Sequence, residues 1–98
     1  MSKMIQESIR NRIVKFFRDT EIERAYLFGS YSRNEEIPGS DLDILVNVNP
    51  EIGYLKFVRY QRELSELLGI QVDLLTQDSI SPHILPFIQE DLRLIYER

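Results

Sequence analysis

Two aspartates one residue apart, Asp41 and Asp43, open the most apolar stretch of this 98-residue chain. The pair Gly29-Ser30 precedes them, separated by ten residues. A carboxylate beside a buried strand costs free energy unless a neighbouring group compensates its charge. A divalent metal ion that carries a phosphate would do so. One short segment therefore supplies both a candidate metal site and a candidate phosphate cradle, and the fold has to bring them together.

The spacing of apolar residues predicts an α/β chain. Helical spacing predicts helices over residues 3–19, 52–68 and 82–91, the last with a kink or a break at Pro86. Runs rich in Leu, Ile and Val predict four strands, over residues 22–28, 41–48, 70–76 and 92–96. The order of these elements predicts a mixed four-stranded sheet with helices packed on it. We expect a single domain over residues 1–98.

The composition indicates a packed intracellular protein. Hydrophobic residues make up 43% of the chain, and cysteine is absent. The lack of cysteine excludes disulfides, thiolate metal sites and cysteine nucleophiles. The N-terminus lacks the apolar region of a secretory signal, and no apolar run approaches the length of a membrane span. We therefore expect a cytoplasmic location and no membrane association.

The charge is acidic overall but unevenly distributed. The net charge of −4 argues against a nucleic-acid polymer as substrate, because proteins that hold such polymers by the backbone usually present a basic surface. Residues 1–18, however, carry five basic side chains and one acidic one. Two interpretations stay open for this segment: a solvated helix face, or a docking surface for an acidic partner.

Three aspartates are candidate metal ligands. Alternate side chains of a strand share a face, so Asp41 and Asp43 are expected to point the same way with α-carbons roughly 6.5 Å apart. Asp73 interrupts a later apolar strand and would complete a triad beside them. Such oxygen ligands suit Mg²⁺ or Mn²⁺, and a triad can hold two ions about 3.5–4 Å apart for in-line phosphoryl displacement. Asp73 is also the candidate general base for an attacking hydroxyl.

The residues between the first two predicted strands are candidates for binding phosphate. Gly29 allows close approach of the backbone, and Ser30 can cap a helical turn whose free N–H groups face an anion. Arg33 adds a positive charge for the β- or γ-phosphate, and Ser40 is expected to bind phosphate or orient Asp41. Each residue alone has an ordinary explanation in turn chemistry or surface exposure. Their joint pattern favours a nucleotide site.

The segment 28–46 resembles the signature of the nucleotidyltransferase superfamily that includes DNA polymerase β. More narrowly, it is similar to the minimal nucleotidyltransferases, whose pattern is Gly-Ser, ten residues, and Asp-x-Asp. The resemblance covers nearly the whole chain and implies a polymerase β-like fold. It further implies that Gly29 and Ser30 contact the triphosphate, that Asp41 and Asp43 bind metal, and that Asp73 is the third acidic residue.

Family resemblance also implies a partner. Minimal nucleotidyltransferases are commonly encoded beside a HEPN protein, a helical ribonuclease toxin, and act as its antitoxin. Characterised members transfer AMP from ATP to a tyrosine near the ribonuclease site of the toxin. The resemblance thus implies ATP as substrate, Mg²⁺ as cofactor, and a hetero-oligomer with the toxin, with self-association as a further state.

Two other functions are compatible with the sequence. The chain would act as a binding module if it masked a toxin by occlusion without catalysis. It would act on a small molecule if it resembled aminoglycoside-modifying relatives, but those usually carry an extra domain for the acceptor, and this chain shows none. Because 98 residues leave little to enclose both ATP and an acceptor, we expect a second protein to close the site and present the acceptor hydroxyl.

Overall fold

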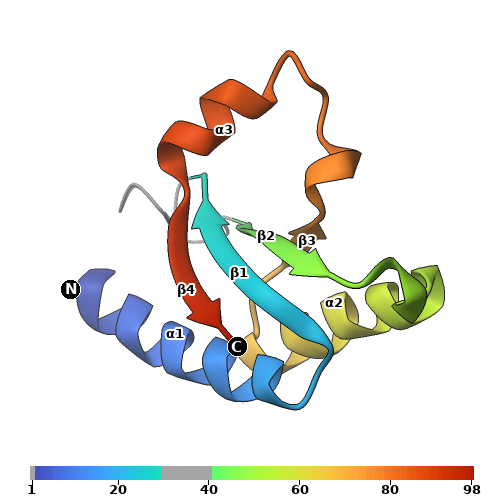
Figure 1. Ribbon diagram of the computed structural model, residues 1–98. Helices are drawn as coiled ribbons and strands as arrows, with labels where there is room; N and C mark the ends of the chain where they lie inside the picture. Colours follow the sequence, from blue (N-terminus) through green and yellow to red (C-terminus); the bar gives the residue numbers. More distant parts are fainter. Residues whose placement is uncertain (1, 30–40) are drawn as a thin grey trace.

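The computed structural model, described over residues 2–29 and 41–98, is a four-stranded mixed sheet with helices packed against it (Figure 1). The expected fold class is confirmed. The helices and strands are α1 (Ser2–Arg18), β1 (Ile22–Phe28), β2 (Leu42–Val48), α2 (Tyr54–Leu68), β3 (Val72–Leu75), α3 (Leu85–Asp91) and β4 (Arg93–Glu97). Two 3₁₀ turns, η1 (Pro50–Ile52) and η2 (Gln77–Ser79), follow β2 and β3.

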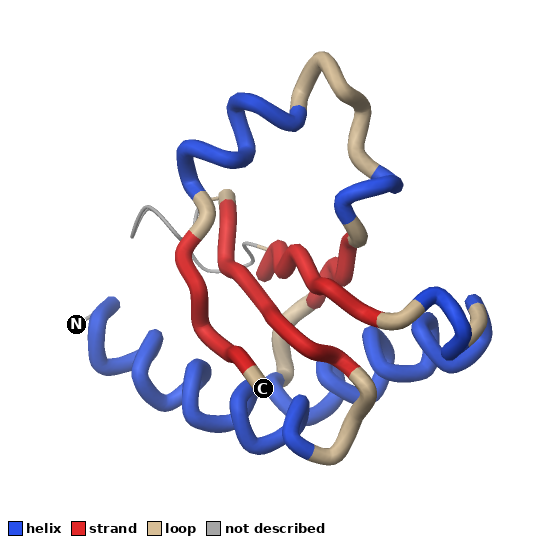
Figure 2. The backbone as a smooth tube through the Cα atoms, in the orientation of Figure 1, coloured by secondary structure: helices blue, strands red, loops and turns tan. Residues whose placement is uncertain are grey.

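The strands lie in the order β3-β2-β1-β4 (Figure 2). The central strand β1 runs antiparallel to both of its neighbours, β2 and β4. The pair β2 and β3 is parallel, and a parallel pair requires a crossover connection, which α2 supplies. This topology fixes which residues of β2 and β3 lie beside each other.

Helices α1 and α2 lie on the same side of the sheet and cover it with apolar side chains (Figure 1). Alternate residues of β2 face them and are fully buried, as its strand periodicity predicts: these are Leu42, Ile44 and Val46. The buried helical side chains that meet them are Ile9, Ile13, Phe17, Tyr60 and Leu64. Among the described residues, no helix is both long and apolar enough to cross a membrane.

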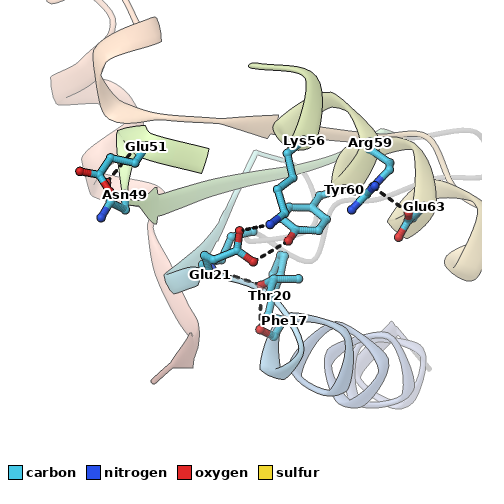
Figure 3. A network of polar contacts seen from close by, with 10 residues as sticks. Phe17, Thr20, Glu21, Asn49, Glu51, Lys56, Arg59, Tyr60 and Glu63 are labelled. Carbon is cyan, nitrogen blue, oxygen red and sulfur yellow. Dashed lines mark hydrogen bonds and ion pairs between the residues drawn. The ribbon is translucent and has the colours of Figure 1, made fainter. Parts of the chain in front are cut away.

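A small polar network ties the turn before β1 to α2 (Figure 3). Glu21 accepts a hydrogen bond from the hydroxyl of Tyr60 (2.8 Å) and pairs with the ammonium of Lys56 (2.6 Å). These hydrogen bonds, from Lys56 first and then Tyr60, hold the pKa of the Glu21 carboxyl below its usual range. The hydroxyl of Thr20 donates to the carbonyl of Phe17 (2.7 Å) and closes the turn at the end of α1. The helical layer is therefore fixed to the sheet by polar contacts as well as by the core.

The last helix differs from the sequence prediction. It begins at Leu85, and residues 82–84 form a turn instead of its first residues. Pro86 consequently lies in the first turn of α3, where its missing N–H would have no partner in any case. Of the two predicted alternatives, a kink at Pro86 is wrong, because this proline lies in the first turn of the helix. The predicted stretch 82–91 is instead divided into a turn and a shorter helix.

The second helix and the second and third strands begin later than predicted. Gly53, with φ of 79°, separates η1 from α2, so the helix starts at Tyr54. The second strand starts at Leu42, and Asp41 lies just before it. The third strand is limited to four residues, Val72–Leu75. The identity and order of the elements agree with the prediction, and the shifts affect their ends.

We expect Leu64→Ala to lower the free energy of unfolding by about 2–5 kcal/mol, because the fully buried Leu64 side chain would leave a cavity between α2 and the sheet. The matched control is Leu67→Ala on the same helix, where the side chain is 49% exposed and the loss should stay below about 1 kcal/mol. Urea unfolding followed by circular dichroism measures both. Equal losses in the two variants would contradict this assignment of the core.

Candidate functional site

Asp43 and Asp73 lie side by side on neighbouring strands. Asp43 of β2 is the register partner of Asp73 of β3 in the parallel pair. Side chains of register partners point to the same face, and on β2 this is the face away from α1 and α2, since Leu42 and Ile44 face the core. Both aspartates are half-buried. The fold thus brings together two of the three predicted acidic residues.

The acidic pair borders an apolar row of the same sheet face. Phe28 of β1 is the register partner of Asp43, so the three strands present Phe28, Asp43 and Asp73 in line. Two residues away along each of these strands, on the same face, a second row of register partners crosses all four strands: Leu94, Tyr26, Leu45 and Leu75. Phe28 and Leu45 are buried although they lie outside the main core. The sheet face away from α1 and α2 therefore combines a carboxylate pair with a row of apolar side chains.

The pKa of Asp43 is affected by both of the other predicted acidic residues. Burial raises the pKa of the Asp43 carboxyl above its usual range, and the negative charges of Asp73 and then Asp41 raise it further. Asp41 itself is exposed at the entrance to β2. Negative charge is therefore concentrated at one place, and a bound cation would relieve the repulsion.

Gly29 lies directly against Asp43. A Cβ atom on Gly29 would stand 2.7 Å from Oδ2 of Asp43, closer than two such atoms can approach. Its φ of 76° also lies in the left-handed region, which disfavours any other residue. The backbone conformation thus favours glycine where β1 ends, and any larger residue would also move the Asp43 carboxylate. The same position is the first residue of the predicted phosphate cradle.

The described carboxylates do not form a complete metal site by themselves. Within residues 2–29 and 41–98, no group of three His, Cys, Asp or Glu side chains is arranged to hold a metal ion. The roles of Asp41, Asp43 and Asp73 as metal ligands stay predictions from the sequence. The donor set at Asp43 and Asp73 contains only carboxylate oxygens, and such donors fit Mg²⁺ or Mn²⁺ when further oxygen ligands complete the shell. Phosphate groups of a nucleotide are suitable ligands of that kind.

Three of the predicted phosphate-binding residues lie outside the described part of the chain. These are Ser30, Arg33 and Ser40. Their roles stay predictions from the sequence.

Sequence reasoning missed the two contacts that surround Asp43. It assigned no site role to Phe28, which pairs with Asp43 across β1 and β2, and it did not foresee that Gly29 touches the carboxylate. One signal was present for the pairing alone: strands that follow each other in the chain often lie side by side. The register that sets Gly29 against Asp43 is not encoded in that order.

The chain is similar to known nucleotidyltransferases in sequence. The chain matches the nucleotidyltransferase domain family over residues 9–95. It is 38% identical over 89 residues to "Putative protein adenylyltransferase MJ0126" of Methanocaldococcus jannaschii, covering 90% of this chain and 91% of that protein. It is also 32% identical over 79 residues to the protein adenylyltransferase MntA of Shewanella oneidensis, covering 79% of this chain and 57% of that protein.

Solved structures share the fold. A toxin–antitoxin complex with AMP-PNP contains a chain that matches with a TM-score of 0.77 and 26% identity, covering 91% of this chain and 73% of that one. A minimal nucleotidyltransferase structure matches with a TM-score of 0.77 and 25% identity, with 90% of both chains covered. A complex of tri-AMPylated Shewanella oneidensis HEPN toxin with MNT antitoxin matches with a TM-score of 0.72 and 25% identity, covering 95% of this chain and 73% of that one.

We expect Gly29→Ala to displace the carboxylate of Asp43, because the added Cβ would occupy the position 2.7 Å from Oδ2. The matched control is Gly69→Ala, where φ is also positive (67°) but a Cβ would meet no atom within 4 Å. Both variants should lose about 1–2 kcal/mol of stability from the left-handed backbone. Only Gly29→Ala should change the carboxyl chemical shift and titration of Asp43 in ¹³C NMR. An unchanged Asp43 titration would contradict the contact.

We expect Asp43→Asn to be more stable than the wild type at neutral pH. A carboxyl whose pKa is raised on folding destabilises the folded state at pH values above the folded pKa, and this penalty disappears below the unfolded pKa. The advantage of the variant should therefore shrink as the pH falls through the Asp43 pKa. Thermal unfolding between pH 3 and pH 8 measures it (about the range in which carboxyl groups titrate). The exposed Asp78→Asn is the control, and an equal gain there would refute the burial effect.

Proposed function

The chain belongs to the minimal nucleotidyltransferase family, and we propose that it transfers AMP from ATP to a hydroxyl group of a partner protein. The observation that carries the proposal is the carboxylate pair Asp43 and Asp73 on the sheet face away from α1 and α2, with Gly29 held against Asp43. The relatives named protein adenylyltransferases support the same chemistry.

In the proposed reaction, the acceptor oxygen attacks the α-phosphorus of ATP. A bond forms between that oxygen and the phosphorus, and the bond from the α-phosphorus to the oxygen bridging to the β-phosphate breaks, so that pyrophosphate leaves. Asp73 takes the proton of the acceptor hydroxyl, for which its half-buried position beside Asp43 is suited. The product is an AMP group joined to the partner by a phosphodiester bond.

Asp41, Asp43 and Asp73 would hold Mg²⁺ or Mn²⁺, with two ions as the arrangement we propose. When bound, the ions neutralise the triphosphate and make the acceptor hydroxyl more acidic. Support comes from the mutual repulsion of the three carboxylates and from their oxygen-only chemistry. The phosphates of ATP would be bound by Gly29, Ser30, Arg33 and Ser40. The phosphate oxygens would complete the metal ligand shell that the described carboxylates leave open.

We further propose that the acceptor is a tyrosine of a HEPN toxin and that the chain is its antitoxin in the cytoplasm, where ATP is available. The structure of tri-AMPylated HEPN toxin bound to MNT antitoxin supports this choice, as does the toxin–antitoxin complex with AMP-PNP. The position of the carboxylates on the sheet face that α1 and α2 do not cover also favours a second protein as the source of the acceptor.

The test incubates the chain with ATP, Mg²⁺ and the HEPN protein encoded beside it, followed by intact-mass measurement of both proteins. We expect the partner to gain the mass of one or more AMP groups. Asp43→Asn should reduce the rate by at least about 100-fold, because even indirect support of a metal site is worth 10–100-fold. Asp78→Asn should retain the wild-type rate, and chelation of the metal should abolish transfer.

Two results would refute this function. One is the absence of any AMP-sized gain on the partner in the presence of wild-type chain. The other is full neutralisation of the toxin by Asp43→Asn, which would instead assign the chain to masking without catalysis. Counting bound Mn²⁺ in the presence of a non-hydrolysable ATP analogue tests the two-ion arrangement separately.

A further inference from the structure

Helix α3 exposes large apolar side chains and buries none. Ile84, immediately before the helix, is 54% exposed, and Phe87 within it is 71% exposed. No residue of α3 is fully buried, whereas the apolar sides of α1 and α2 form the core. Exposed side chains of this size on a short helix indicate a contact surface more than a packing element.

Helix α3 stands at the same end of the sheet as the carboxylates (Figure 1). It leads into β4 at Arg93, which is the register partner of Leu27. The next residue of β1, Phe28, is the register partner of Asp43. A helix of seven residues spans about 10 Å, so its exposed apolar residues remain within one helix length of this edge.

A second exposed apolar group lies at the start of α2, at the end of the sheet far from Asp43. Tyr54, Leu55 and Val58 are its exposed members. They follow the end of β2 at Val48, five residues and about 17 Å along the strand from Asp43. A protein whose hydroxyl must reach Asp43 would therefore contact α3 before it contacts this group.

The charges around α3 indicate what the partner surface must look like. Glu90 is exposed on the helix, and Asp41 is exposed at the entrance to β2 beside the half-buried acidic pair. Arg93 is the one exposed lysine or arginine among the described residues within two positions of the helix, so that acidic groups outnumber basic ones there. The chain as a whole carries a net charge of −4. Apolar anchors next to exposed carboxylates are complementary to an apolar patch bordered by basic side chains.

We propose that Ile84 and Phe87 form the docking surface for the acceptor protein, which presents an apolar patch with a basic border and is held so that its hydroxyl faces Asp43 and Asp73. This proposal rests on the proposed function, since it assumes that the acceptor is a protein. Phe87 is the principal anchor, because a large aromatic side chain that becomes buried at the centre of an interface contributes most to affinity.

The experiment compares Ile84→Ser and Phe87→Ser with Leu55→Ser, a matched control at an 83% exposed position on α2. The probe is the HEPN protein encoded beside the chain, and its affinity is measured by isothermal titration calorimetry. We expect about a 10- to 30-fold loss of affinity for Phe87→Ser, a smaller loss for Ile84→Ser and less than about a twofold change for Leu55→Ser. Binding of an ATP analogue and the thermal midpoint should be unchanged in all three.

Hydrogen exchange gives a second readout that needs no substitution. Backbone amides of residues 84–91 should become protected in the complex, and those of residues 54–58 should not. Wild-type affinity in both α3 variants, loss of affinity in Leu55→Ser alone, or no binding of the wild type to the HEPN protein would each overturn the docking proposal. Tight α3-dependent binding without AMP transfer would instead uphold the docking surface and refute the proposed enzymatic function.

Discussion

The parallel pairing of β2 with β3 is the interaction on which the rest of the structure depends. It sets Asp43 beside Asp73, and it requires the crossover that α2 provides. Because α2 packs on the same face as α1, these two helices lie on one side of the sheet, and the carboxylates lie on the other. The division between a stabilising face and a reactive face thus follows from one strand pair.

The reactive face works against stability, as functional sites commonly do. A half-buried carboxylate next to two further carboxylates raises the free energy of the folded chain at neutral pH. The helical face compensates through a contiguous apolar core and through the contacts of Glu21 with Lys56 and Tyr60. Neither set of contacts involves the acidic pair, so the two faces have largely separate energetic roles.

The sequence predicted the elements and the acidic pair well because both depend on local patterns. Alternation along β2 correctly separated Leu42 and Ile44 from Asp43, and the sheet followed from the order of the elements. The contact between Gly29 and Asp43 could not be predicted, because it depends on the register between two strands. Pro86 was misread because the same residue breaks a helix in its interior and starts one in its first turn. The sequence-based roles of Ser30, Arg33 and Ser40 fall outside the described residues.

The strict alternation of faces along β2 has an evolutionary consequence. Insertion or deletion of a single residue between Leu42 and Asp43 would turn every later side chain of the strand to the opposite face. Asp43 would then face the core under α1 and α2, and Ile44 and Val46 would face away from it. A length change of two residues leaves each side chain of the strand on its original face. Lineages descended from this chain should therefore vary in length at the connections between elements, while the number of residues in this strand stays fixed or changes by two.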